Sequence, residues 1–355
     1  MNKKIDNIFI LNGHRSPITK KGGWLSDVNP VSMIGALIST QVDINPSNIS
    51  GIIIGQCFQD KLNIAKQIYD YNYEALTINS GCTSGLEAIK IAIERILLSD
   101  YDSNIYIAGG VENMSSYIDS NPDILKWNGS KMLDQCDEYA KYSGISKKDC
   151  DLYAALSYRK YYKSGLKIDD VYQHCSYVDL EPINPINPHG VCTVGNSSNI
   201  ADGAAIVVIA SGSAIDIEKD NPIAKVIAYD SGTYDNTFTA CADSIKNALI
   251  KAELSIDDID LMEINEGFAA QMIGTIRKLG LSDNYDFIEN KINVYGGSIA
   301  MGHPLGASGA RIMVTLLNGL VLRKNVKYAL ASIAGAGGQA TTIVLENMRR
   351  YKDNV

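Results

Sequence analysis

The sequence predicts an α/β protein built from two similar halves. Short apolar runs typical of buried strands alternate with stretches of helical period near both ends of the chain. Such alternation forms βα units around a mostly parallel sheet. A small-residue turn at 82–85 precedes a helix, a strand and a glycine pair, and a similar series follows residues 307–309. This repetition indicates duplication, and we expect the two helix starts to meet at a central cleft.

Each half contains its own expected elements. In the first half we expect strands at 5–11, 49–55, 74–79, 104–108 and 204–210 and helices at 31–42 and 86–98. In the second half we expect strands at 224–229, 259–264 and 328–333 and helices at 244–252, 269–279 and 310–322.

A lobe of different character interrupts the first half. From residue 116 to 188 tyrosine, lysine and aspartate become frequent and strand-like runs disappear. Helical patterns at 134–142 and 148–163 predict an inserted, mostly helical domain. The predicted domains are an N-terminal half (1–115 plus 189–213), the inserted domain (116–188) and a C-terminal half (214–355).

The composition is typical of a globular enzyme. The chain has 355 residues, of which 46% are hydrophobic and 20% charged, enough for two or three domains. A net charge of −8 argues against nucleic acid or an anionic membrane as the main partner. We expect a cytoplasmic protein, because no apolar run reaches the length of a membrane span and no signal-peptide pattern is present. The seven scattered cysteines form no Cys-x-x-Cys pair, so we expect neither a disulfide framework nor a metal site.

Cys82 is the first candidate catalytic residue. It stands directly before the apolar helix at 86–98, among Gly81, Thr83, Ser84 and Gly85. Unpaired N–H groups at a helix start carry partial positive charge, which favours the thiolate that attacks carbonyl carbons. A small buried cysteine in a helix cap is the alternative interpretation.

Two further residues could complete such a site. His303, in a Gly-His-Pro sequence within a glycine-rich loop, could accept the thiol proton or donate to an oxyanion. Asn265, at the end of the strand at 259–264, could hold a water molecule. Taken alone, His303 could equally be a hydrogen-bonded loop histidine, and Asn265 with Glu266 could be a helix cap.

The residues around these candidates resemble the thiolases, acyl-CoA C-acyltransferases, over nearly the whole chain. The longest matching signature is Gly-Gly-x-x-Ala-x-Gly-His-Pro-x-Gly-Ala-Ser-Gly at 296–309. The matching pieces stand in the family's order at 82–85, 108–115, 195–198 with 202–205, 265–271 and 296–311. The resemblance implies a five-layered αβαβα core of two duplicated halves, with an inserted domain that binds coenzyme A.

The resemblance also implies roles for the candidate residues. Cys82 would take the acyl group as a thioester, and His303 would activate it and line one oxyanion hole with a water held by Asn265. The backbone N–H groups of Cys82 and Ala336 would form a second oxyanion hole. Fixed donors lower the barrier because thioester attack and Claisen condensation both place negative charge on carbonyl oxygens.

The sequence departs from the thiolase pattern at Ala334. Thiolases usually carry a second cysteine there, which exchanges a proton with the substrate α-carbon, and alanine cannot do this. Ser332 shares the strand face but is too weak an acid, and nothing in the sequence brings Cys192 or Cys241 to this place. Loss of a general acid–base group usually costs about 10²–10⁴ in rate, so acylation could survive while carbon–carbon chemistry is slow.

Coenzyme A and acyl-CoA are the expected substrates and partners, with no permanently bound cofactor. Met132 matches a substrate-pocket methionine of the family, Lys131 stands where a histidine is usual, and Ser244 is near the place of a coenzyme-contacting serine. Thiolase tetramers add contacts from an extended loop early in the inserted lobe. The segment 115–131 is far shorter than the family's usual segment, so we expect a homodimer.

Three functions remain open from the sequence. The first is an acetyl-CoA C-acetyltransferase that condenses or cleaves acetoacetyl-CoA. The second is a thiolase-fold acyltransferase or acyl-CoA hydrolase that stops at acyl-Cys82. The third is a non-catalytic protein that binds acyl-CoA, although Cys82, His303 and Asn265 together favour the first two.

Overall fold

Two sheets joined by one pair of strands form the core of the fold. The computed structural model describes residues 7–58, 63–69, 72–99, 104–118, 126–127, 130–165, 169–170 and 176–350. The two strand orders are β1-β8-β5-β3-β4 and β10-β11-β12-β9, and β1 pairs with β9. In the first sheet the strands are β1 (Ile8–Arg15), β3 (Gly51–Gly55), β4 (Glu74–Ile78), β5 (Ile105–Asn113) and β8 (Ala201–Ser211). In the second they are β9 (Ala224–Thr233), β10 (Ile259–Ile264), β11 (Tyr328–Ala334) and β12 (Gln339–Asn347).

The two sheets repeat one topology. β3 and β5 run parallel, β5 and β8 antiparallel, and β8 and β1 antiparallel. The pairs β10–β11, β11–β12 and β12–β9 repeat these relations in the same order. The first sheet adds β4 beside β3, whereas the equivalent place beside β10 holds a single parallel bridge between Met262 and Ile292. The predicted duplication is therefore confirmed at the level of strand order and direction.

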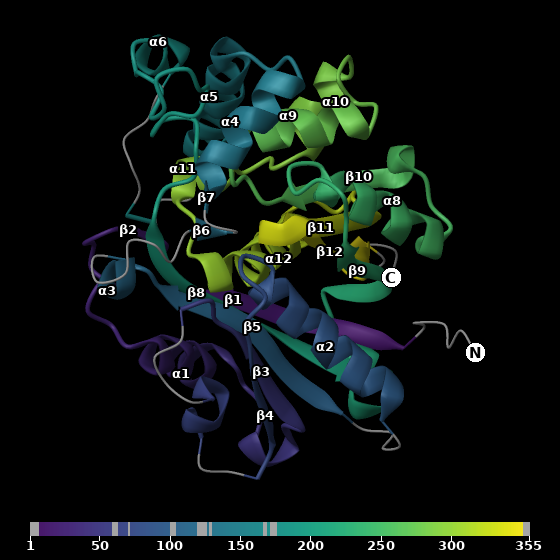
Figure 1. The fold of residues 1–355 in the computed structure, drawn as a ribbon. Coiled ribbons are helices and arrows are strands. Elements are labelled where there is room, and N and C mark those ends of the chain that lie inside the picture. The colour runs from purple at the N-terminus through teal and green to yellow at the C-terminus, as the bar shows by residue number, and fades with distance from the viewer. Residues whose placement is uncertain are drawn as a thin grey trace.

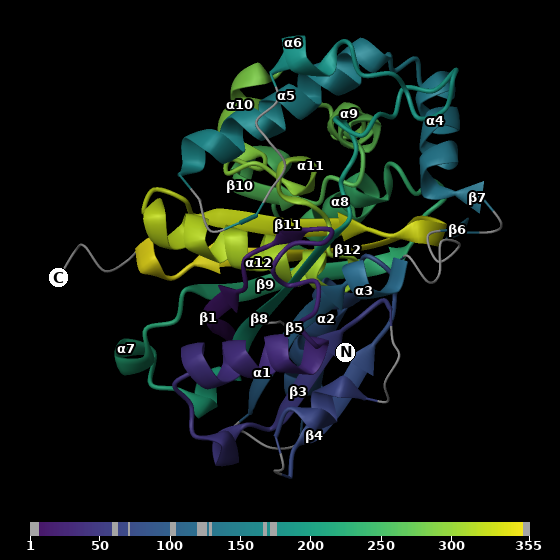
Figure 2. The ribbon, with the colours of Figure 1, turned by 90° about the vertical axis from the view of Figure 1, so that its left-hand side faces the viewer.

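Helices complete a five-layered arrangement (Figures 1 and 2). The helices α2 (Ser84–Leu98) and α12 (Leu305–Leu322) lie between the sheets, and their apolar side chains share one core with both inner faces. A second core joins α1 (Pro30–Gln41) to the outer face of the first sheet. A third joins α8 (Ala240–Ala252) and α9 (Ala269–Lys278) to the outer face of the second sheet.

Glycines bring the two central helices into direct contact. A Cβ atom on Gly85 would lie 2.6 Å from the carbonyl oxygen of Gly306, and one on Gly309 would lie 2.4 Å from the backbone nitrogen of Leu86. Both distances are too short for a side chain, so only glycine permits this crossing. By length and apolar composition α12 could cross a membrane, but most of it is buried between the sheets as a core helix.

The inserted lobe is mostly helical, as predicted. Its helices are α4 (Met132–Tyr142), α5 (Lys147–Ser164) and the short α6 (Tyr177–Leu180), and β6 (Lys126–Trp127) pairs with β7 (Ser130–Lys131). Ser146 and Asp149 form a capping box that begins α5. The lobe covers the second half, because α5 packs against α9 and α11 (Ser298–Met301) (Figure 1).

Glu266 fastens the lobe to the second half. Its carboxylate accepts hydrogen bonds from the hydroxyls of Tyr153 at 3.0 Å and Ser157 at 2.7 Å, both on α5. It also accepts one at 2.9 Å from the side-chain amide of Asn293. These partners come from two separate segments, so Glu266 joins α5 and the Asn293 segment to the residues that follow β10.

Several elements extend beyond their predicted bounds. The strand expected at 104–108 continues as β5 to Asn113, so Glu112 lies in the sheet and not in a closing loop. Glycine makes this possible, because a Cβ on Gly109 would lie 2.1 Å from the carbonyl oxygen of Ala205 on β8. α12 begins at Leu305 and α8 at Ala240, each several residues earlier than expected. The remaining short elements are β2 (Thr19–Lys20), α3 (Ser115–Ile118), α7 (Ile217–Asp220), α10 (Tyr285–Lys291) and 3₁₀ turns at Pro46–Asn48, Ile64–Gln67, Gly212–Ala214, Ile256–Asp258 and Ala336–Gly338.

Candidate active site

Cys82 occupies a tight turn between β4 and α2. Gly81 adopts a left-handed backbone conformation with φ of 62°, which favours glycine. The hydroxyl of Thr83 donates to the carbonyl oxygen of Ser80 at 2.7 Å, and that of Ser84 donates to the carbonyl oxygen of Gly81 at 2.6 Å. These bonds fix the turn and leave Cys82 half-buried directly before the helix.

The environment of Cys82 favours a protonated thiol. Burial raises the pKa of Cys82 to about 12, its own backbone N–H lowers it, and the nearby Glu112 carboxylate raises it further. The expectation that the helix start favours the thiolate is therefore wrong. Placement at a helix start does not offset the cost of a buried thiolate beside a carboxylate.

His303 is buried and held as a neutral base. Its Nδ1 lies 2.5 Å from the hydroxyl oxygen of Ser308, and that hydroxyl donates to the carbonyl oxygen of Pro304 at 2.9 Å. The serine oxygen must therefore accept from Nδ1–H, which leaves the lone pair on Nε2. Burial, with a smaller contribution from Arg311, lowers the pKa of His303 to about 3. The imidazole is thus an acceptor at neutral pH.

Asn265 faces His303 with its amide nitrogen. Nδ2 lies 3.4 Å from Nε2 of His303, while Oδ1 accepts a hydrogen bond from the Ser298 hydroxyl at 2.7 Å. Arg311 donates to the same hydroxyl oxygen at 2.8 Å. Because Oδ1 is already occupied as an acceptor, the network orients the amide so that it donates toward His303. Ser298 and Arg311 were not singled out from the sequence, since only their position in space gives them this role.

The structure brings the parts of the predicted site to one interface. The carbonyl oxygen of Gly306, three residues after His303, lies against Gly85, three residues after Cys82. From the second sheet, a Cβ on Gly335 would lie 3.6 Å from the backbone nitrogen of Cys82. Ala336 follows Gly335 and opens a 3₁₀ turn. The two helix starts and the end of β11 therefore converge.

Ala334 lies at the end of β11 beside this interface. It packs on the apolar core that includes Cys241 of α8, and the Ser332 hydroxyl lowers the pKa of the Cys241 thiol. Cys241 is fully buried, and burial raises its pKa to about 12. Cys192 belongs instead to the core of the lobe. Of the two cysteines considered as substitutes, only Cys241 lies in the core shared with Ala334.

The predicted coenzyme-side residues have different surroundings. Lys131 is exposed at the start of α4, and Met132 is partly buried against the core of the lobe. Ser244 is fully buried, and its hydroxyl donates to the carbonyl oxygen of Asp230 at 3.4 Å. The expectation for Ser244 is corrected, because a hydroxyl inside the packing of α8 against β9 is not exposed to a ligand.

A cavity of about 310 Å³ lies between α4 and the segment before α8. Phe238 lines it and stacks on Tyr139 with ring centroids 5.2 Å apart. On its other side Phe238 meets the edge of Phe268, at 6.3 Å between centroids. Phe268 lies three residues after Asn265, so a row of aromatic rings connects this cavity to the strand end that carries Asn265.

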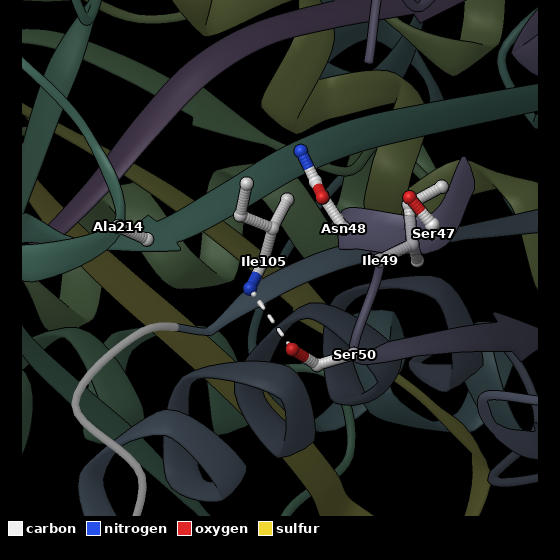
Figure 3. Close-up of a pocket in the computed structure, with 6 residues that line it drawn as sticks. All are labelled: Ser47, Asn48, Ile49, Ser50, Ile105 and Ala214. Carbon is white, nitrogen blue, oxygen red and sulfur yellow. Dashed lines mark hydrogen bonds between the residues drawn. The ribbon is translucent and has the colours of Figure 1, made fainter. Parts of the chain in front are cut away.

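A larger depression, of about 410 Å³, lies away from this chemistry (Figure 3). It is formed where β3 and β5 begin, and the Ile105 N–H donates to the Ser50 hydroxyl oxygen at 3.2 Å. Ligands in α/β proteins usually bind at the carboxyl ends of parallel strands. Cys82 follows the carboxyl end of β4, so this depression is at the opposite edge. Its lining residues are Ser47, Asn48, Ile49, Ser50, Ile105 and Ala214.

Comparison with protein families agrees with the fold. The thiolase N-terminal domain model matches residues 8–171, and the thiolase C-terminal domain model matches residues 220–347. The chain belongs to the thiolase family and is a thiolase-type acyltransferase. An acetyl-CoA acetyltransferase of Syntrophomonas wolfei is 32% identical, covering 96% of this chain and 98% of that protein. One of Yarrowia lipolytica is 30% identical, covering 97% and 98%.

Solved structures show the same architecture. The Bacillus anthracis acetyl-CoA acetyltransferase superposes with a TM-score of 0.86 at 26% identity, covering 98% of this chain and all of that chain. A human mitochondrial 3-ketoacyl-CoA thiolase solved with CoA superposes with a TM-score of 0.81 at 27% identity, covering 97% and 98%. The predicted thiolase fold is confirmed.

Proposed function

We propose that the protein transfers acyl groups from acyl-CoA through a thioester on Cys82. The observation that carries this proposal is the convergence of a half-buried thiol with a loop whose imidazole is held neutral. As the sulfur attacks the thioester carbonyl, its proton passes to the lone pair on Nε2 of His303, which gives up its long contact with the Asn265 amide. Collapse of the tetrahedral intermediate breaks the bond to the coenzyme sulfur, which takes that proton and leaves as a thiol.

Two sets of donors would stabilise the oxyanion in each step. The Asn265 amide and the protonated His303 form one set, because the Ser298 bond directs Nδ2 toward the ring. The backbone N–H groups of Cys82 and Ala336 form the other, supported by the close approach of Gly335 to Cys82. Such donors stabilise charge that develops only in the transition state.

The preferred reaction is acetoacetyl-CoA cleavage or its reverse, the condensation of acetyl-CoA. Ala334 favours a second candidate, an acyltransferase or hydrolase without Claisen activity, because it cannot move the α-proton. Cys241 does not supply that proton, since its thiol is fully buried and burial raises its pKa to about 12.

Coenzyme A is the proposed partner, on the side of the lobe that carries Lys131 and Met132. The cavity lined by Phe238 supports this placement because its aromatic row leads toward Asn265. We further propose a cytoplasmic homodimer. The dimer proposal rests on the short segment 115–131, part of which lies outside the described residues, and light scattering showing a stable tetramer or a monomer at micromolar concentration would contradict it.

Mass spectrometry after incubation with acetyl-CoA tests the acyl-enzyme directly. We expect one acetyl group per chain, mapped to the peptide containing Cys82 and absent from Cys82→Ser. Cys57→Ser is the matched control, because Cys57 is a partly buried cysteine near the same site and its loss should leave the adduct in place. Acetylation elsewhere, or none at all, would contradict the proposed nucleophile.

A further inference from the structure

The turn between β11 and β12 carries one of the proposed oxyanion donors, the N–H of Ala336. Gly337 and Gly338 follow it, and both adopt left-handed backbone conformations, with φ of 76° and 78°. The N–H of Gly335 donates to the carbonyl oxygen of Gln339 at 2.8 Å, which closes one side of the turn. The direction of the Ala336 N–H therefore depends on how the other side of the turn is held.

The segment that follows β9 holds this other side. The N–H of Tyr234 donates to the carbonyl oxygen of Gly338 at 2.8 Å, and a Cβ on Gly338 would lie only 2.0 Å from the carbonyl oxygen of Tyr234. The N–H of Gly338 donates in turn to the hydroxyl oxygen of Thr237 at 2.9 Å. Both backbone groups of Gly338 are thus bonded to one neighbouring segment, and one of these bonds depends on a single side chain.

That segment is itself anchored at both ends. At its start the hydroxyl of Tyr234 donates to the carboxylate of Asp230, which also accepts a hydrogen bond from Nζ of Lys251 on α8 at 2.7 Å. At its end the side-chain oxygen of Asn236 accepts one from the N–H of Phe238 at 2.9 Å. The hydroxyl that bonds the turn is therefore presented from a fixed position.

The first half contains the same pair of contacts at the equivalent place. Ser16 follows β1 as Tyr234 follows β9, and its N–H donates to the carbonyl oxygen of Ala204 at 2.9 Å. The N–H of Ala204 donates back to the hydroxyl oxygen of Ser16 at 2.9 Å. Ala204 lies inside the regular strand β8, whereas Gly338 lies in the turn before β12. The contact that supports a strand in the first half therefore holds the turn with Ala336 in the second.

We infer that Thr237 is a positioning residue for the second oxyanion hole, because its hydroxyl fixes the Gly338 peptide and thereby the direction of the Ala336 N–H beside Cys82. This inference rests on the proposed function, in which that N–H stabilises the oxyanion. A donor that turns away from the developing charge loses its effect, since the stabilisation requires hydrogen-bond geometry. Thr237 also lines the cavity of about 310 Å³ next to α4, so direct contact with the coenzyme is the competing role.

Single-turnover acetylation of Cys82 in Thr237→Val tests the inference, because valine keeps the shape and removes the hydroxyl. We expect the saturating rate with acetyl-CoA to fall about tenfold, part of the roughly 10²–10³ that loss of a whole oxyanion donor costs, with the half-saturating concentration changed by less than about twofold. S-acetyl-N-acetylcysteamine has the same thioester without the nucleotide and should show the same fall. Thr237→Ser keeps the hydroxyl and should retain most of the wild-type rate.

Thr239→Val is the matched control. Thr239 is two residues further along the chain, and its hydroxyl oxygen accepts a hydrogen bond from Nζ of Lys278 at 3.3 Å instead of one from the turn. Its loss should leave the acetylation rate unchanged. A fall with acetyl-CoA alone would assign Thr237 to coenzyme binding, and an equal fall in Thr237→Ser or Thr239→Val would show a general structural role. Each of these results would overturn the inference.

Amide hydrogen exchange separates this inference from the proposed function, since it needs no acyl transfer. We expect the N–H of Gly338 to exchange about tenfold faster in Thr237→Val, and in the smaller Thr237→Ala, because both lack its acceptor. Unchanged exchange would overturn the inference. Faster exchange in a protein whose wild type acquires no acetyl group on Cys82 would reject the proposed function and leave the hold of Thr237 on the turn in place.

Discussion

The two central helices begin in the same way and are used differently. α2 starts beside Cys82, whose backbone nitrogen faces the Gly335 segment of the other half. α12 starts beside Gly306, whose N–H is bound by Glu112 of the other half. Each start therefore receives a strand end from the opposite half. The two strand ends differ, because β5 supplies a carboxylate to the start of α12, whereas β11 supplies only backbone groups to the start of α2.

This difference shows how a duplicated fold can produce one active site instead of two. Both helix starts offer unpaired N–H groups with partial positive charge. In the second half Glu112 accepts a hydrogen bond from one of these groups, the N–H of Gly306, so that helix start becomes a structural joint. In the first half the corresponding groups lie beside a thiol and are available, in our proposal, for a substrate oxyanion.

Removal of the nucleophile at the start of α2 should have the largest effect on activity. In Cys82→Ser we expect acyl transfer to fall by at least about 10³-fold, because a serine hydroxyl is a much poorer nucleophile than a thiol. Steady-state thiolysis of acetoacetyl-CoA measures this. Cys57→Ser should retain most of the activity, and a comparable loss there would mean that Cys57 takes part.

Adding one methyl group at the equivalent place in the second half should disrupt the structural joint. A Cβ on Gly306 would lie 2.8 Å from Gln56 Cα and 2.9 Å from the Cys57 nitrogen, and backbone atoms cannot easily move away. We expect Gly306→Ala to lower the free energy of unfolding by about 2–3 kcal/mol in urea titrations.

The control for this variant is Gly35→Ala on α1. A Cβ on Gly35 would meet no atom within 4 Å, so alanine there should be neutral or stabilise by about 0.5–1 kcal/mol. Equal stabilities for the two variants would show that the Gly306 segment tolerates displacement and that the close approach is not required.

A thiol at the end of β11 should add a proton-transfer group to the site at the start of α2. Ala334→Cys places a proton-transfer group of suitable pKa beside the interface, with modest steric cost because Ala334 is only partly buried. We expect acetoacetyl-CoA cleavage to rise by about tenfold, with little change in acetylation of Cys82. Fast wild-type cleavage that the substitution lowers would mean that another residue already moves the proton, and Cys241→Ala and Cys192→Ala would then identify it.

The smallest expected effect is that of pH on the first half-reaction. Since the pKa of His303 is lowered to about 3, its imidazole stays an acceptor throughout pH 5.5–8 and is protonated only well below that range. Single-turnover acetylation of Cys82 should therefore change by less than about threefold across these pH values. A loss of half the rate near the ordinary histidine pKa of about 6.5 would contradict the buried, neutral imidazole.

The sequence predicted the architecture well because the strands and helices are regular and apolar. β10 has the predicted bounds, and the alternation of strands with helices identified both halves. The family signature located Cys82, His303 and Asn265. The signature piece at 108–115 contains Glu112 but gave it no role, because Gly109 and Gly110 were interpreted as the end of a strand, whereas they allow β5 to continue against β8 and α12.

Other parts of the site depend on contacts that no local pattern contains. The pKa of Cys82 is set by burial and by a carboxylate thirty residues away, which outweigh the helix start that the sequence displays. The orientation of Asn265 depends on Ser298 and Arg311, which reach it from α11 and α12. The error at Ser244 arose from the start of α8, which lies earlier than its periodicity indicated and turns that hydroxyl inward.

The hydrogen bonds of the Glu266 carboxylate make the inserted lobe a link between the two halves of the chain. The lobe leaves the chain from the first half, yet Tyr153 and Ser157 attach it to the second half. The halves are joined a second time through β1 and β9. Any force that pulls them apart must therefore break both connections as well as the core around α2 and α12. Because Glu266 directly follows Asn265, a tilt of the lobe is transmitted within one peptide bond to the amide that faces His303.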